Sequence, residues 1–341
     1  MDLRLSDEQR AVRATFAALF RRESTPQRVR IAESTGLDKD LWRSYSAIEA
    51  LSIGIPSDYG GSDGSLLELA LVAQEAGRCL APIPVAETAA AARLLARLGE
   101  KELLAPVLNG SSIVSLATRN APVGDQLLVD GAIADAVLVL DGEALLYVTR
   151  PDGQPTIPRR NLGGLPLARW DVHTTGRSLA EGAQARTEFA AALDEIRVLR
   201  AAALVGLAEE AVHIGSEYTK VRKAFGQPIG MYQAVAHPFA DSISALDGAQ
   251  LLVHKACWAL DSGHDDGAAL ATMAFVFAAE TAYQATQHSL HVHGGYGFTE
   301  EYDIQLYYRR AKAWAVAFAD PQRELLVLAD RRFGPARTGG H

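Results

Sequence analysis

The fold of this chain is decided by one stretch in its second half, Tyr218-Thr219-Lys220-Val221-Arg222-Lys223-Ala224-Phe225-Gly226-Gln227-Pro228-Ile229-Gly230. Apolar residues recur at helical spacing before and after it, which predicts a long helix on each side. Gly226, Pro228 and Gly230 are unfavourable in a helix interior and predict a tight turn. The turn carries Arg222, whose planar guanidinium suits a phosphate or pyrophosphate. The stretch therefore predicts a helix-turn-helix that presents fixed positive charge.

Two motifs in this half of the chain resemble the acyl-CoA dehydrogenase family. The first joins the turn to the next helix, Arg222-x-x-Phe225-Gly226-Gln227-Pro228-Ile229 followed by Gln233-Ala234-Val235-x-His237. The second comes later, His293-Gly294-Gly295-Tyr296-Gly297-Phe298. In that family the Arg and Phe reach across a dimer interface to a neighbour's FAD. The resemblance thus implies that Arg222 and Phe225 contact FAD bound in another subunit; taken alone, Arg222 would be an ordinary solvated helix-end cation.

The same resemblance implies further cofactor contacts. Gln233, Gly294 and Gly295 match family positions near the FAD. His291 stands where the family usually has a Gln close to the FAD phosphates, and an imidazole N–H can make the same donation. For His291, simple packing is the alternative.

Composition excludes several classes of protein. With 341 residues, 48% of them hydrophobic, the chain can bury a sizeable core. Its net charge of -8 gives no basic footprint for nucleic acid. Cys79 and Cys257 are too far apart for a disulfide framework or a metal cluster, and as small buried hydrophobes they suit a reducing compartment. Because no signal-peptide or membrane-spanning run is present, we expect a cytoplasmic protein without a bound metal or a membrane anchor.

The chain is predicted to be mostly α with a small β domain, in the α+β class. Ser6-x-x-Gln9 is a capping-box pattern that opens the first helix, and Leu66–Arg78 reads as a strong helix. Ile53–Gly61 resembles a glycine-rich turn of the family. Four short apolar, β-branched runs, 113–116, 127–129, 136–140 and 144–149, predict strands. Four Ala-rich helices follow at about 190–220, 231–262, 267–292 and 301–333. The predicted units are an all-helical domain at 1–110, a reduced β domain at 111–187, a four-helix bundle at 188–333 and a tail at 334–341.

The middle domain departs from the family's pattern. Where a full-length member has a Thr-Glu-Pro-x-x-Gly-Ser-Asp-like stretch that holds the flavin, this chain has Thr118–Asp125. Val129–Asp135 stands where the family has its flavin-stacking Trp segment. The resemblance therefore implies an eroded in-chain flavin cradle.

The catalytic base that the family needs is also missing from both of its usual places. Acyl-CoA dehydrogenation removes the α-proton of a thioester with a carboxylate. The family puts this Glu either ten residues before the Gly of Gly206-Leu207-Ala208, which is Ile196 here, or twenty-four residues after Gly294, which is Phe318. Glu195 is one residue away and predicted to point elsewhere, and Asp320 is the fallback candidate for a displaced base.

These observations predict a subunit of a heteromeric FAD-dependent acyl-CoA dehydrogenase. It resembles the short subunit of α2β2 enzymes of actinobacterial steroid side-chain degradation, whose longer homologous partner carries the catalytic Glu. The substrate would then be a bulky acyl-CoA. The alternatives are a self-sufficient homomeric dehydrogenase or oxidase using Asp320, a flavin-dependent monooxygenase of the same fold, and a binding paralogue without flavin.

Overall fold

The computed structural model describes residues 3–118, 125–150, 158–172 and 176–334. The first part is helical, with helices α1 (Asp7–Glu23), α2 (Pro26–Ala32), α3 (Lys39–Ala47), α4 (Leu66–Arg78), α5 (Val85–Arg97) and α6 (Lys101–Leu108). Ser6 and Gln9 form the predicted capping box, because each side chain accepts from the other residue's backbone N–H. The bounds of α4 match the predicted helix.

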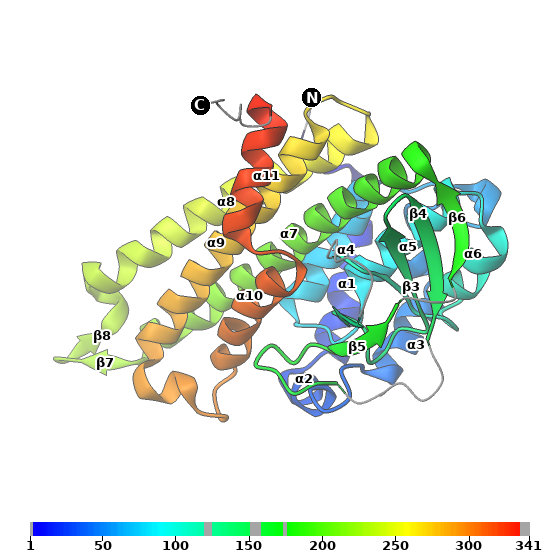
Figure 1. The fold of residues 1–341 in the computed structure, drawn as a ribbon. Coiled ribbons are helices and arrows are strands. Elements are labelled where there is room, and N and C mark those ends of the chain that lie inside the picture. Colours follow the sequence, from blue (N-terminus) through cyan, green and yellow to red (C-terminus); the bar gives the residue numbers. More distant parts are fainter. Residues whose placement is uncertain (1–2, 119–124, 151–157, 173–175, 335–341) are drawn as a thin grey trace, which may run out of the picture.

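A small β region follows, on the right of Figure 1. Its four-stranded sheet has the order β1 (Val114–Leu116), β3 (Ala136–Asp141), β4 (Ala144–Thr149), β6 (Arg177–Glu181), with β1 parallel to β3 and the other pairs antiparallel. A second pair joins β2 (Asp125–Leu128) to β5 (Ala168–Asp171). The sequence predicted the first four strands within a few residues and missed β5 and β6.

The second half is a helical bundle organised by one 40-residue helix, α7 (Gly182–Val221). It crosses the whole molecule and contacts α4, α5, α8 (Gln233–Asp261), α9 (Gly267–His293) and α10 (Ile304–Phe318). A mostly helical chain with a small sheet was predicted, and the structure confirms that class. The helix begins earlier than the predicted residue 190, because the chain turns directly from β6 into it at Gly182, where φ is +60°.

The fourth predicted bundle helix, 301–333, is wrong as a single element. The structure has two helices, α10 and α11 (Pro321–Phe333). Ala319 between them is extended, and the Asp320 carboxylate caps α11, which has Pro321 in its first turn. Because proline lacks an N–H and fits the first turn of a helix, it starts a new helix here.

Helices α4 and α7 approach each other closely enough to require glycine. A Cβ on Gly206 would lie 1.8 Å from the Gln74 carbonyl oxygen, and one on Gly77 would lie 2.0 Å from that of Ala203. This contact fixes the first half of the chain against the bundle. Within the described ranges, no helix is both long and apolar enough to cross a membrane.

Candidate functional site

The turn after α7 is a β-hairpin that projects from the end of the bundle, at the left of Figure 1. Its strands are β7 (Lys223–Ala224) and β8 (Gln227–Pro228), and the two residues between them, Phe225 and Gly226, have φ of +52° and +86°. Two positive-φ residues give the turn a twist that suits a tight hairpin. The ring of Phe225 at its tip is 98% exposed. The hairpin therefore offers an aromatic side chain to something outside this chain.

Arg222 stands at the base of the hairpin. Its backbone N–H donates to the Tyr218 carbonyl at 2.9 Å and its carbonyl accepts from Ile229 at 2.8 Å. The Arg222 side chain is exposed and forms no ion pair with any residue in the described ranges. The backbone is thus fixed while the guanidinium remains available for an anion.

The other predicted cofactor residues gather around the same end of the bundle. His291 lines a shallow hollow together with Phe225, Tyr232 and Val235, and Gln233 is the exposed first residue of α8. Gly294 and Gly295 follow in the 3-10 turn Gly294–Phe298 (η4), where a Cβ on either would meet no atom within 4 Å. Packing within the chain therefore gives no reason for Gly295 to lack a side chain.

His293, which the sequence reasoning passed over, links the two motifs. Its ring stacks on Tyr218 with centroids 4.1 Å apart, and its Nδ1 lies 2.7 Å from the Ser289 carbonyl oxygen. Burial lowers the pKa of His293, so the neutral ring is favoured. The sequence could have pointed to His293, because it stands directly before Gly294 in the second motif.

Both expected base positions lie in the interior and are filled by hydrocarbon. Ile196 is fully buried on α7. Phe318, at the end of α10, packs edge-on against Phe275 with centroids 5.1 Å apart, and the Arg197 guanidinium lies 5.7 Å from its ring. None of these side chains can accept a proton from a thioester.

The two nearby acids are engaged elsewhere. Glu195 Oε1 accepts from Arg93 at 2.9 Å and from Arg97 at 2.7 Å, both on α5. Asp320 Oδ1 accepts the Gln322 backbone N–H at 3.0 Å as the cap of α11. The structure therefore gives each of them a structural partner.

A buried polar cluster lies beside the Ile196 position, and the sequence reasoning missed it. Arg200, one helical turn after Ile196, donates through Nε to Glu87 Oε1 at 2.6 Å. Asp130, in the loop between β2 and β3, accepts from Ser115 Oγ at 2.8 Å. Burial, and then the charge of Glu87, raise the pKa of Asp130 to about 7. The sequence could have pointed to this cluster, because Glu87 and Arg200 are charged residues within largely apolar helical segments.

The segment that stands where the family holds its flavin, and where we expect an eroded cradle, falls partly outside the described residues, which exclude 119–124. A mostly apolar groove of about 240 Å³ runs between β2, residues 161–167 and α10. Its one polar lining side chain, Asn161, already donates to the carbonyls of Arg159 and Leu165 and accepts from Gly163 and Leu165. The described lining thus has no free side chain for the polar edge of a flavin, whereas the hairpin end does.

Two family models match the chain: acyl-CoA dehydrogenase, N-terminal domain, over residues 6–110, and acyl-CoA dehydrogenase, C-terminal domain, over residues 187–318. The chain is 30% identical to acyl-CoA dehydrogenase IpdE2 of Mycolicibacterium smegmatis over 331 residues, covering 95% of this chain and 98% of the relative. IpdE2 of Mycobacterium tuberculosis is 31% identical, with 94% and 96% covered.

Solved structures show the same fold. The Tcur3481-Tcur3483 steroid ACAD G363A variant matches with a TM-score of 0.85 and 26% identity, covering 95% of this chain and 97% of that chain. The ChsE4-ChsE5 complex from Mycobacterium tuberculosis matches with a TM-score of 0.86 and 23% identity, covering 98% and 100%.

Proposed function

Because the chain belongs to the acyl-CoA dehydrogenase family, whose cofactor is FAD, we propose that it is the non-catalytic subunit of a heteromeric enzyme of this class. One contrast carries the proposal. Arg222 and Phe225 are exposed on a hairpin directed away from the body of the chain, while Ile196 and Phe318 fill both base positions with hydrocarbon.

The chemistry divides between two chains. When bound, FAD takes up the β-hydrogen of the acyl-CoA as hydride. The guanidinium of Arg222 would hold the pyrophosphate of a cofactor bound by the partner, and Phe225 would contact its ring system. Gln233 and His291 supply hydrogen-bond donors at the same end. The partner supplies the carboxylate that removes the α-proton.

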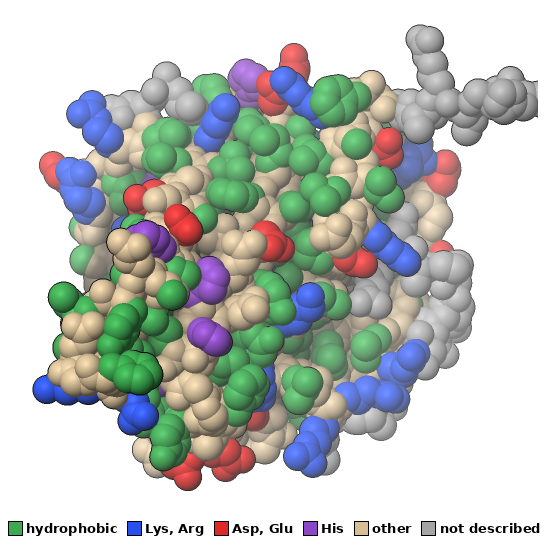
Figure 2. All heavy atoms as spheres, turned by 90° about the vertical axis from the view of Figure 1, so that its left-hand side faces the viewer, with side chains coloured by type: hydrophobic (Ala, Val, Ile, Leu, Met, Phe, Trp, Pro, Cys, Tyr) green, Lys and Arg blue, Asp and Glu red, His purple; other side chains and the backbone are tan. Residues whose placement is uncertain are grey.

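A group of partly exposed apolar side chains on α8 and α9 supports the presence of a partner. It comprises Ile243, Leu251 and Trp258 of α8 with Met273 and Phe277 of α9, between 38% and 51% exposed, and we call it the α8–α9 apolar face. Figure 2 shows hydrophobic side chains gathered across the side of the molecule that carries these helices. Exposed apolar patches of this kind mark interaction sites. A longer homologous acyl-CoA dehydrogenase is the proposed occupant, giving an α2β2 assembly.

The proposed substrate is a bulky acyl-CoA, of the kind formed when a steroid side chain is degraded. Support comes from the similarity to the steroid ACAD structure, which is 26% identical to this chain and shares its fold.

Flavin stoichiometry tests the proposal. The chain is co-expressed with a longer homologue that has an intact Glu, and flavin released by acid is measured against protein. We expect about one FAD per heterodimer, and a colourless or poorly soluble product when the chain is expressed alone. A soluble yellow homotetramer with acyl-CoA dehydrogenase activity would show that the chain is self-sufficient.

A further inference from the structure

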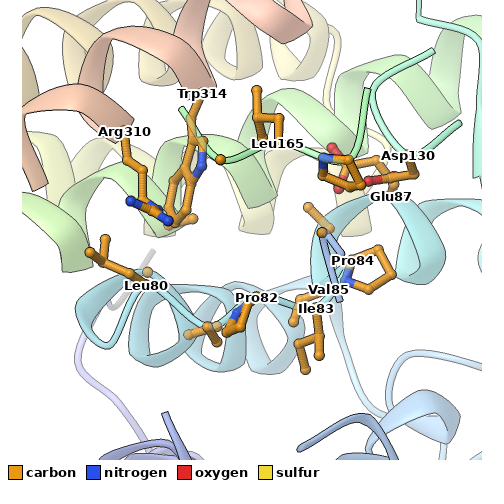
Figure 3. A pocket seen from close by; sticks show the side chains of 18 of the residues that line it. Leu80, Pro82, Ile83, Pro84, Val85, Glu87, Asp130, Leu165, Arg310 and Trp314 are labelled. Carbon is orange, nitrogen blue, oxygen red and sulfur yellow. The ribbon is translucent and has the colours of Figure 1, made fainter. Parts of the chain in front are cut away.

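A small pocket lies between the turn from α4 to α5, residues 163–166 and α10. Its volume is about 80 Å³, and apolar side chains of Leu80, Pro82, Ile83 and Leu165 form much of its wall (Figure 3). An engineered apolar cavity of roughly 150 Å³ holds benzene, so this pocket suits a chain of a few carbons rather than a fused ring system.

One end of the pocket carries an under-compensated positive charge. Arg310 is only 3% exposed, and its Nη2 lies 2.9 Å from Glu33 Oε1. Arg309 binds the same oxygen at 2.8 Å, so two guanidiniums share one carboxylate. Burial lowers the pKa of Arg310, and Glu33 is the only carboxylate near enough within the described ranges to oppose that effect. A buried charge needs a counter-charge, and Arg310 shares its counter-charge, the Glu33 carboxylate, with Arg309.

Trp314 adds an unused donor at the same end. It lies one helical turn after Arg310 and beside it at the pocket wall (Figure 3). The side chain is 8% exposed, yet its indole N–H donates to no residue of the described ranges. The nitrogen is not among the fully buried atoms that lack a partner, so this N–H remains accessible to a ligand. A cation and a neutral donor therefore lie side by side at this end of the pocket.

The wall that faces Arg310 contains Gly164, whose lack of a side chain leaves room for Arg310 and Glu33. Gly164 has φ of +62°, and a Cβ there would lie 2.8 Å from Arg310 Nη2 and 3.0 Å from Glu33 Cγ. On the opposite side of the pocket lie Asp130 and Glu87. On that side Glu87 is bonded to Arg200, which also lines the pocket, whereas Arg310 shares its carboxylate with Arg309, so an anionic ligand is favoured at the Arg310 end.

We propose that this pocket binds a carboxylate carried on a short hydrocarbon chain. The carboxylate accepts from Arg310 and Trp314, and the hydrocarbon lies along Leu80, Ile83 and Leu165. The ligand is either a free short-chain acid or the terminal carboxylate of an acyl-CoA. The site requires neither FAD nor a partner chain, so it goes beyond the function proposed above.

Ligand-observed NMR on the full-length chain tests the site. Valerate is titrated against pentylamine, which has the same carbon chain and the opposite charge. Valeryl-CoA and glutaryl-CoA, which differ in a terminal carboxylate, form the second pair. Saturable binding of valerate identifies a free acid as the ligand, and preferential binding of glutaryl-CoA identifies an acyl-CoA. Either result supports the proposal if Arg310→Gln weakens the binding at least tenfold.

A second variant keeps the result interpretable if Arg310→Gln fails to fold. Ile83→Trp fills the pocket without touching the charges, and it should abolish the same binding. Ile31→Trp, on the exposed face of α2, is the matched control and should leave binding unchanged. The proposal is overturned if no carboxylate binds, if pentylamine binds equally well, or if Ile83→Trp has no effect. Flavin content plays no part in these measurements, so their failure leaves the proposed function standing.

Discussion

The hairpin end and the interior beside Ile196 differ in how their polar and aromatic side chains are placed. At the hairpin, Arg222, Phe225 and His291 are exposed and have few contacts within the chain. Beside Ile196, Arg200 is bonded to Glu87 and Asp130 to Ser115, and Phe318 fills the remaining base position. The first region is suited to complete a site elsewhere, and the second is suited to hold this chain together. Substitutions in the two regions should therefore change different measurements.

The largest effect is expected from Phe318→Ala. Removing a buried aromatic ring leaves a cavity, which lowers the free energy of unfolding by about 3–5 kcal/mol. Urea denaturation of the full-length chain measures this loss. Val316→Ala, on the exposed side of the same helix, is the control and should cost far less. A loss of bound FAD without a loss of stability would place Phe318 in a cofactor site instead.

Arg222→Ala should give the reverse pattern. Losing a charge-assisted contact to pyrophosphate costs roughly 1.5–3 kcal/mol, so FAD affinity of the assembled enzyme should fall about 10- to 150-fold. Stability of the chain should change little, because the side chain is exposed. Flavin fluorescence titration measures the affinity. Arg222→Lys keeps the charge but loses the planar guanidinium with its paired N–H donors, so its FAD affinity should lie between those of the wild type and Arg222→Ala. Unchanged affinity in Arg222→Ala would remove the hairpin from the cofactor site.

The pH dependence of stability should be altered by Asp130→Asn. The folded pKa of Asp130 is raised from 3.8 to about 7, so the folded state holds the proton more tightly than the unfolded state. This group therefore lowers stability as pH rises from about 4 to 7, by at most roughly 1.4 kcal/mol per pH unit. The stability difference between wild type and variant should change across that window and be flat above it. A difference that is constant from pH 4 to 8 would contradict the buried acid.

The smallest effect is expected from Asp320→Ala. Loss of a helix cap costs about 0.5–2 kcal/mol, while turnover of the FAD-saturated complex should stay nearly unchanged. Glu195→Ala should also leave turnover nearly unchanged, because Arg93 and Arg97 already bind that carboxylate. Removing a true base would lower the rate at least about 10²-fold. Such a loss in Asp320→Ala, with flavin still bound, would make this chain the catalyst.

Local patterns allowed much of the fold to be predicted. The capping box at Ser6, the bounds of α4 and the turn after α7 depend on residues adjacent in sequence. The break between α10 and α11 was missed because helical periodicity continues across it, although Pro321 was a visible stop signal. Strands β5 and β6 were missed because pairing partners far apart in the sequence determine them.

The site was predictable only where a motif carried it. Arg222, Phe225 and the glycines after His293 belong to recognisable motifs, and the structure places them at one end of the bundle. The pairs Arg200–Glu87 and Arg310–Glu33 join segments more than a hundred residues apart. No local pattern reveals such pairs, because tertiary packing alone decides which buried charges meet.

Helix α7 holds the residues along it at fixed distances from one another. Arg222 follows Ile196 by 26 residues, which at the rise of an α-helix is roughly 39 Å. Because α7 is one continuous helix, it keeps these two places far apart. Mutations can accumulate at one end without harm at the other, so two related genes can each lose a different half of the chemistry and become dependent on each other.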